Sequence, residues 1–332
     1  MATIKDVARK AGVSVATVSA VINRDSGVNV SAELTEKVEK AIKKMNYRPN
    51  RIARALSRKE TQTIAYVVPT VNNDFFAQMA HFIEDKAFEK KYGVYLCNTH
   101  SRLDRVDLYM DILIENKVAG VLTTLTWDII EKGFIESIQE ENIPIVGLAG
   151  ARIIEGIDTI TLNDVQGGKI ATEHLLQKGH ERIGFIGIEN SKTTEVRLTG
   201  YKQALTEAGL DLDERYIEVG RNFSREEGYS LAEKLYQKCP EITAIFAYND
   251  IMAAGVIDRF NDLGRSIPDE MAVVGYDNSI ASYTRPKLTT LDLSKEKMVE
   301  KAMDVLFKRI AREEFEFSHK KISPRLIIKE SS

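Results

Sequence analysis

The chain has 332 residues, 43% of them hydrophobic and 29% charged, and carries a net charge of −3. This composition can bury the cores of about two globular domains. No stretch approaches the ~18 consecutive apolar residues of a membrane span, and the N-terminus lacks the residue order of a signal peptide. We therefore expect a cytoplasmic protein with no membrane partner. Cys97 and Cys239 are too few for a disulfide framework or a zinc site, so reduced thiols are expected.

Two short helices joined by a tight turn are predicted at the start of the chain. Thr3, followed by Asp6, resembles a capping box for the first helix. Gly12 suits a tight turn, and Ser14 is a good N-cap for a second helix that runs to about Asn23. Helices joined in this way are typical of the helix-turn-helix motif. A small three-helix bundle that binds another protein is the alternative.

A third helix is predicted from about Ser31 to Met45, because apolar residues recur on one face. Residues 1–60 carry 13 Lys/Arg and 6 Asp/Glu, a net charge of +7. The whole chain carries −3, which leaves −10 on residues 61–332. A basic end on an acidic body suits a headpiece that contacts phosphates while the body stays off the DNA. Residues 50–58 follow as a hinge of about eight residues, too short to be a stable helix unless two copies pack together on DNA.

From Thr63 onward, short β-rich runs alternate with amphipathic stretches of helix length. This alternation predicts parallel sheets covered by helices. The pattern pauses near residues 150–163 and then restarts, which indicates two α/β lobes of similar size. The predicted strands are 63–69, 93–99, 118–125, 143–149, 182–188, 244–249 and 271–277, and the helices between them include 75–92, 106–117, 167–179, 225–238 and 250–264.

The cleft between the two lobes is the expected ligand site, because ligands of such sheets bind beyond the carboxyl ends of the strands. Asp250 begins a helix and is expected to cap it, whereas Asp277 has no helix close behind it and is expected to contact the ligand. Trp127 lies near the rim, either as a stacking platform for a sugar or as a packing residue between helices. Polar or aromatic residues follow the strand ends at Asn73, Asp74, Phe75, Phe76, Thr126, Trp127, Asn249, Asp250, Asp277 and Asn278.

The sequence contains neither a metal-binding nor a catalytic pattern. Its five histidines form no HExxH motif, and neither GxSxG nor GxxxxGK[ST] is present. The glycine pair at 167–168 lacks the GxGxxG spacing of a dinucleotide site. We expect no enzyme activity, no cofactor and no metal. A nucleotide-dependent enzyme and a small-molecule binding protein such as a solute receptor are the alternative classes, and the basic headpiece argues against both.

Several segments of the chain resemble one family. Residues 3–23 read TIKDVARKAGVSVATVSAVIN, and residues 46–56 read NYRPNRIARAL. Further segments are VNNDFF (71–76), GGKIATEHLLQKGHERIGFIG (167–187), RLTGYKQAL (197–205), FAYNDIMAAGVI (246–257), VVGYDN (273–278) and RPKLTTL (285–291). Over essentially the whole chain, these segments closely resemble the LacI/GalR family of bacterial transcription repressors. The resemblance implies an all-α helix-turn-helix headpiece and a two-lobed α/β body like that of periplasmic binding proteins.

The resemblance also implies domain bounds and partners. The family's chain crosses between lobes three times, here near 161–164, 290–293 and 320–324. We therefore expect a headpiece at 1–48, a hinge at 49–61, an N-terminal lobe at 62–162 plus 291–321, and a C-terminal lobe at 163–290 plus 322–332. The expected partners are double-stranded operator DNA, a small effector and a second copy of the chain. A homodimer is expected because the sequence ends at SPRLIIKESS without the heptad tail of family tetramers.

The second helix is expected to read DNA, because the first residues of a recognition helix meet base edges in the major groove. Val15 and Ala16 can touch thymine methyl groups but cannot donate hydrogen bonds. Many relatives carry Arg or His in place of Ala20, whose alternative role is helix packing. In the family, the residue at Leu56 wedges into a base step through the minor groove, with the hinge arginines on phosphates. The residues expected to contact DNA are Thr3, Ser14, Val15, Ala16, Thr17, Ala20, Asn23, Asn50, Arg51, Ala53, Arg54 and Leu56.

The resemblance also places the effector contacts. Arg197 offers hydrogen-bond donors and Asp277 accepts, so the two could grip a polar ligand between the lobes, beside an aromatic wall. Ala149 stands where several family members have Asp, which removes one customary acceptor for a hydroxyl group. We expect a sugar or a sugar derivative as effector, with a nucleobase or a partner protein as alternatives. The expected effector contacts are Phe75, Phe76, Trp127, Arg197, Phe223, Asn249 and Asp277.

Overall fold

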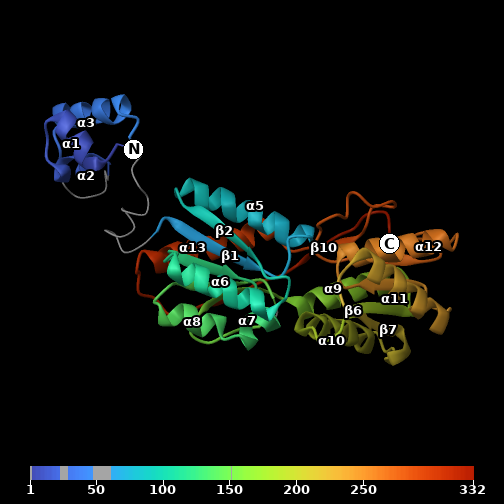
Figure 1. Ribbon diagram of the computed structural model, residues 1–332. Helices are drawn as coiled ribbons and strands as arrows, with labels where there is room; N and C mark the ends of the chain where they lie inside the picture. The colour runs from blue at the N-terminus through green and yellow to red at the C-terminus, as the bar shows by residue number, and fades with distance from the viewer. Residues whose placement is uncertain (1, 23–28, 48–60, 151) are drawn as a thin grey trace. The chain divides into compact units, whose positions relative to one another are not determined.

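The computed structural model describes residues 2–22, 29–47, 61–150 and 152–332. They divide into two compact units, Met1–Thr61 and Gln62–Ser332, which are the headpiece and the body (Figure 1). The expected fold class, an α-helical headpiece followed by a two-lobed α/β body, is confirmed. Among the described residues, no helix is long and apolar enough to cross a membrane.

The headpiece contains α1 (Ile4–Ala11), α2 (Val15–Ile22) and α3 (Ala32–Lys44). The predicted capping box is confirmed, because the Thr3 hydroxyl accepts from the Asp6 amide while the Asp6 carboxylate accepts from the Thr3 amide. Gly12 ends α1 with a φ of 66°, in the left-handed region that favours glycine. Ser31 caps α3, as predicted. The three helices pack around Val7, Val18 and Val38, which are fully buried.

The first lobe of the body is built on a parallel six-stranded sheet in the order β11-β5-β4-β3-β1-β2. Helices α5 and α13 cover one face of this sheet and α6, α7 and α8 the other (Figure 1). The strands are β1 (Thr63–Val68), β2 (Gly93–Asn98), β3 (Gly120–Thr123), β4 (Ile145–Leu148), β5 (Asp158–Leu162) and β11 (His319–Ile322), and the helices are α5 (Asp74–Glu89), α6 (Leu103–Glu115), α7 (Trp127–Glu131), α8 (Phe134–Glu140) and α13 (Lys295–Ile310).

The second lobe is built on a parallel four-stranded sheet in the order β7-β6-β8-β9. Helices α9 and α10 pack on one face of this sheet, and α11 and α12 pack on the other. The strands are β6 (Ile183–Ile188), β7 (Ile217–Gly220), β8 (Ala244–Ala247) and β9 (Ala272–Val274), and the helices are α9 (Asp164–Gln177), α10 (Lys192–Glu207), the 3-10 turn η1 (Glu214–Tyr216), α11 (Arg225–Lys238) and α12 (Asp250–Asp262).

The chain leaves and re-enters each lobe. After β5 it runs straight into α9 of the second lobe, and after β9 it reaches β10 (Thr290–Asp292) and then α13 of the first lobe. Strand β11 joins the first sheet beside β5, where His319 lies opposite Thr159. The chain then forms β12 (Arg325–Ile327), which pairs with β10 in an antiparallel ribbon. These passages fall where the three crossings were expected, while the lobe bounds themselves stay a prediction.

Two glycines allow α9 and α10 to approach each other closely. A Cβ atom at Gly168 would overlap the carbonyl oxygen of Arg197, and one at Gly200 would overlap the carbonyl oxygen of Val165. At the start of α9, a Cβ atom at Gly167 would overlap the Tyr276 hydroxyl. The glycine pair at 167–168 is therefore explained by helix packing and not by phosphate binding.

We predict that Gly168→Ala lowers the free energy of unfolding of the body by roughly 1–3 kcal/mol, because an added methyl group must push α10 away. Denaturant titration followed by circular dichroism measures the change. Gln166→Ala, at an exposed position two residues earlier on α9, is the control and should have little effect. Equal stability of Gly168→Ala and wild type would contradict the close packing of the two helices.

Candidate functional sites in the headpiece and the body

The first turn of α2 is capped and faces solvent. The Ser14 hydroxyl accepts from the Thr17 amide at 3.0 Å, so the predicted N-cap is confirmed. Val15 is 41% exposed, and Ala16 is also exposed. These two apolar side chains are therefore available to a partner. Thr17 is half-buried, and its hydroxyl lies 2.9 Å from that of Ser14.

Two further residues that were expected to contact DNA make contacts within the headpiece itself. Ala20 is only 8% exposed, so the structure favours its alternative role in helix packing and leaves little surface for a base contact. The Thr3 side chain is exposed, but its hydroxyl donates to Asp6 at 2.7 Å within the capping box. The remaining expected contacts lie outside the described residues: Asn23, Asn50, Arg51, Ala53, Arg54 and Leu56.

In the body, Arg197 is the most constrained of the expected effector contacts. It lies on α10, is 6% exposed, and donates from Nε to Asp164 at 2.8 Å. Its Nη1 donates to the carbonyl oxygen of Tyr248. Burial opposes the charge, but the Asp164 carboxylate raises the pKa of Arg197 above its usual value, so the guanidinium stays charged. Arg197 is therefore a cation held in a fixed position.

Two aromatic rings enclose this guanidinium. The Tyr276 ring centroid lies 3.5 Å from Cζ of Arg197, and the Tyr248 centroid lies 4.8 Å from it. Stacking of this kind suits the planar guanidinium group. The Tyr276 hydroxyl and Oδ2 of Asp164 are buried, and burial together with the Asp164 carboxylate raises the pKa of Tyr276 well above its usual value.

Asp277 lies in the loop after β9, in a strained backbone conformation with a φ of 96°. It is 5% exposed, and its carboxylate accepts from the Ser279 amide at 3.0 Å. The same amide donates to Asp250 at 2.9 Å, so the two carboxylates share a donor. Burial raises the pKa of Asp277 to about 6. Burial also raises the pKa of Asp250 well above its usual value, and the neighbouring Asp277 adds to this effect.

Arg197 and Asp277 both belong to the second lobe, and the ion-pair partner of Arg197 is Asp164. One expectation about the neighbouring residues is wrong. Asn249, not Asp250, caps α12, with its side chain accepting from the Met252 amide at 2.9 Å. Asp250 instead accepts from Ser279 and Thr290 and so ties α12 to the loop after β9 and to β10.

The aromatic residues of the expected site differ in exposure. Phe75 is 8% exposed at the start of α5, and its ring meets that of Phe76 edge-on at 5.1 Å. Phe223 is half-buried in the second lobe, in the cluster that also contains Tyr248. Trp127 begins α7 and is 52% exposed, which excludes tight packing between helices as its main role. Ala149, in the left-handed region at a φ of 61°, is 3% exposed.

Sequence reasoning missed Lys295, the first residue of α13. It is 7% exposed, and its Nζ donates to the carbonyl oxygens of Asp277 and Asn278 in the other lobe. A lysine at the start of a helix is usually exposed, so only the discontinuity of the lobes could have indicated its position. Nothing in the local pattern around residue 295 indicates that it is buried.

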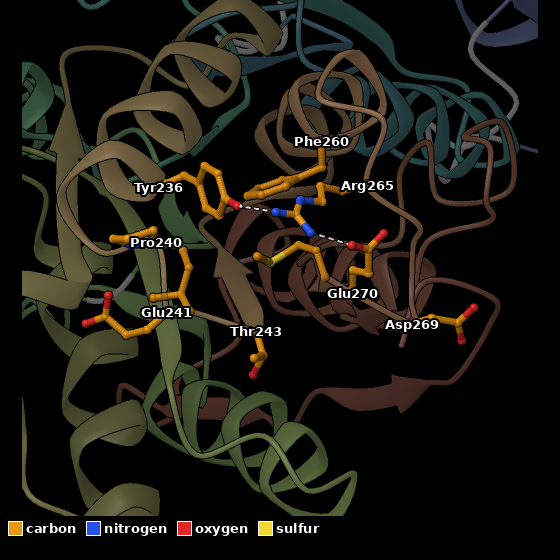
Figure 2. Close-up of a pocket in the computed structure, with 10 residues that line it drawn as sticks. Tyr236, Pro240, Glu241, Thr243, Phe260, Arg265, Asp269 and Glu270 are labelled. Atoms are coloured by element: carbon orange, nitrogen blue, oxygen red, sulfur yellow. Dashed lines mark hydrogen bonds and ion pairs between the residues drawn. The ribbon is translucent and has the colours of Figure 1, made fainter.

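One cavity lies between the lobes and another lies within the second lobe. The first has a volume of about 550 Å³ and is lined by Ile130, Arg152, Ile153, Ile154, Lys192 and Glu195. The second, of about 300 Å³, includes Tyr236, Arg265 and Glu270, and Figure 2 shows Arg265 bridging the other two. Its lining residues Thr243 and Met271 precede β8 and β9, so it lies at the opposite ends of these strands from Asn249 and Asp277.

No group of three or more His, Cys, Asp or Glu side chains within the described ranges is placed to hold a metal ion. Cys97 and Cys239 are buried free thiols, and burial raises the pKa of both.

Comparisons with known proteins agree with this description. A family model described as "Bacterial regulatory proteins, lacI family" matches residues 3–50, and one described as "Periplasmic binding protein-like domain" matches residues 172–332. Two curated relatives named "HTH-type transcriptional repressor PurR" are similar over the full length. The protein from Histophilus somni is 36% identical over 333 residues, which is 100% of this chain and 99% of its own. The protein from Mannheimia succiniciproducens is 35% identical over 334 residues, which is 100% of this chain and 98% of its own.

Solved structures are similar as well. The complex of the transcriptional regulator CelR with cellobiose has a TM-score of 0.74 at 29% identity and covers 100% of both chains. A regulator from Alkaliphilus metalliredigens with bound D-xylulofuranose has a TM-score of 0.72 at 28% identity, over 82% of this chain and 99% of that one. The Lac repressor dimer bound to operator has a TM-score of 0.87 over 99% of this chain and 98% of its own, but at 24% identity it supports the fold alone.

The raised pKa of Asp277 predicts a pH dependence of stability. Between its usual value of 3.8 and about 6, the folded protein keeps a proton that the unfolded chain releases, so stability falls as the pH rises through this range. Asp277→Asn should remove part of this fall, on the order of 1–3 kcal/mol between pH 4 and 7. Thermal unfolding of the body at each pH measures it.

The exposed Asp211 of the same lobe provides the matched control, and Asp211→Asn should keep the wild-type slope. A slope that is identical in all three proteins would mean that Asp277 titrates normally.

Proposed function

Because the chain belongs to the lacI family of bacterial regulatory proteins, we propose that it represses transcription from an operator that it binds as a homodimer, under the control of a small effector held between its lobes. The family membership rests on relatives that are 35–36% identical over the full length. The observation that supports DNA reading best is the capped, solvent-facing first turn of α2, where Val15 and Ala16 are exposed.

The DNA-binding unit carries the charge that this function requires. Lys5, Arg9 and Lys10 are exposed on and beside α1, and residues 1–60 have a net charge of +7. Cations of this kind neutralise phosphates and supply sequence-independent affinity. Apolar side chains at the start of α2 then supply discrimination through thymine methyl groups. Two headpieces in a dimer would read a pseudo-palindromic site.

For the effector, we favour a nucleobase over a sugar. The full-length relatives are repressors named PurR, and this name agrees with the nucleobase alternative. The residues expected at the site include the aromatic side chains Phe75, Phe76 and Phe223 and the buried carboxylate of Asp277, a combination that would suit a planar ring with N–H groups. Ala149 supplies no acceptor for a sugar hydroxyl. A sugar is the second candidate, because the structures at 28–29% identity contain cellobiose and D-xylulofuranose.

If α2 contacts the bases of the operator, Val15→Ala should weaken base preference without weakening non-specific DNA binding. The variant should lose roughly 1 kcal/mol of preference at one base pair of each half-site, because a methyl contact is lost. Binding to unrelated DNA and its salt dependence should stay unchanged, since no phosphate contact is removed. Selection from randomised operators, followed by titration at two salt concentrations, measures both.

Val219→Ala is the matched control for Val15→Ala. Val219 is 43% exposed, close to the 41% of Val15, but it lies in the body. Its truncation should leave operator affinity and base preference as in wild type. If Val15→Ala also keeps the wild-type preference at every position, α2 does not read bases through this side chain.

Wild-type affinity for the operator should itself fall roughly 10³-fold or more between 50 and 200 mM salt.

The effector site predicts a ligand-dependent shift in thermal stability. A nucleobase that binds should raise the melting temperature of the wild-type body, because it binds only the folded state. Asp277→Asn should weaken the binding of that ligand by about 2 kcal/mol or more, since the charge is lost and one of the two acceptor oxygens is replaced by an NH2 donor. Calorimetric titration measures the affinity, with Asp211→Asn as the control. If sugars shift the melting temperature and nucleobases do not, the second candidate replaces the first.

A further inference from the structure

Two side chains of the first lobe fasten the loop that follows β9. Nζ of Lys295 donates to the carbonyl oxygens of Asp277 at 2.6 Å and Asn278 at 3.2 Å. On α5, Nε2 of Gln78 donates to the carbonyl oxygen of Ser279 at 3.3 Å. Lys295 thus enters from the first lobe and binds the main chain of Asp277, the residue that we expect to contact the effector from the second lobe.

One of the three N–H groups of the Lys295 ammonium has no hydrogen-bond acceptor among the described residues. A protonated lysine has three N–H donors and no acceptor, and the two carbonyl oxygens use two of them. No acceptor for the third is found among the described residues of the body. The side chain is 7% exposed, so water has little access to this donor. An unpaired buried donor costs free energy, and a ligand oxygen placed beside it would recover that free energy.

The surroundings of Lys295 locate this donor at the effector site. Its Nζ lies 6.0 Å from the centroid of the Phe75 ring, which is the expected aromatic wall from the first lobe. The charge of Lys295 lowers the pKa of the Asp277 and Asp250 carboxylates and so opposes the effect of their burial. Arg197 acts on Asp277 in the same way. The charged form of Asp277 is therefore favoured by two cations, one from each lobe.

We propose that Lys295 is a specificity-determining residue of the effector site, which donates its third hydrogen to an oxygen of the ligand while Asp277 accepts from a neighbouring N–H or O–H group of that ligand. The proposal rests on the function proposed above and narrows it. The effector is then a cyclic compound with a carbonyl, carboxylate or phosphate oxygen beside a hydrogen-bond donor. A ring without such an oxygen leaves the buried ammonium hydrogen unpaired and is rejected.

Two pairs of probes, each differing by one oxygen-bearing group, test this proposal. Hypoxanthine is compared with purine, and D-glucose 6-phosphate is compared with D-glucose, so the two arms separate a base from a sugar source. In one pair, wild type should bind the compound with the added carbonyl or phosphate group, hypoxanthine or D-glucose 6-phosphate, at least tenfold tighter than its partner. Lys295→Met should reduce this ratio of affinities to near one by weakening the binding of that compound only. Lys295→Arg should keep part of the ratio. Calorimetric titration of the full-length protein measures all four affinities.

Lys297→Met is the control, because Lys297 lies on the same helix but is exposed, and it should keep the wild-type ratio. The Lys295 proposal is overturned if Lys295→Met also keeps that ratio, or if it weakens both members of the pair equally, as a purely structural role would. If wild type binds none of the four probes and none changes its operator affinity, the proposed effector classes fail, and the Lys295 proposal fails with them.

Discussion

The buried charge of Arg197 is the constraint on which the ligand-facing edge of the second lobe depends. A guanidinium taken out of water must keep both its charge and its N–H groups compensated. Asp164 and the Tyr248 carbonyl do this, and the Tyr248 and Tyr276 rings pack against the guanidinium. Because Asp164 begins α9, Arg197 lies on α10 and Tyr276 follows β9, satisfying one charge fixes three elements relative to one another. Gly167 and Gly168 provide the room that this arrangement needs.

The fold could be predicted where local chemistry decides it. Ser14 and Ser31 cap helices as their sequence positions indicate, and most of the predicted strands and helices are present. The prediction missed short strands whose residues do not look like a buried strand. Strand β5 reads DTITL and is fully buried, because Arg309 pairs with Asp158 and His319 bonds to Thr159. Those partners are some 150 residues away in sequence, so no local pattern could reveal them.

The candidate effector site, too, could be predicted only in part from the sequence. The resemblance and the strand-end rule selected residues that do lie in the body near one another, such as Arg197 and Asp277. Their pairings could not be predicted, because Asn249 and Asp250 are equally good helix caps and Asp164 looks like another cap at the start of α9. Only the packed structure shows which carboxylate meets Arg197 and that Lys295 reaches across from the other lobe.

The pairing of β11 with β5 has a consequence for how the protein is made. His319 and Thr159 are neighbours in the first sheet, so the edge of the lobe that begins first cannot close until almost the whole chain has left the ribosome. The second sheet uses only residues 183–274 and can assemble earlier. Contacts of such high sequence separation form slowly. The nascent first lobe therefore has an unpaired strand edge for most of translation. Such an edge is prone to aggregation and can be bound by a chaperone.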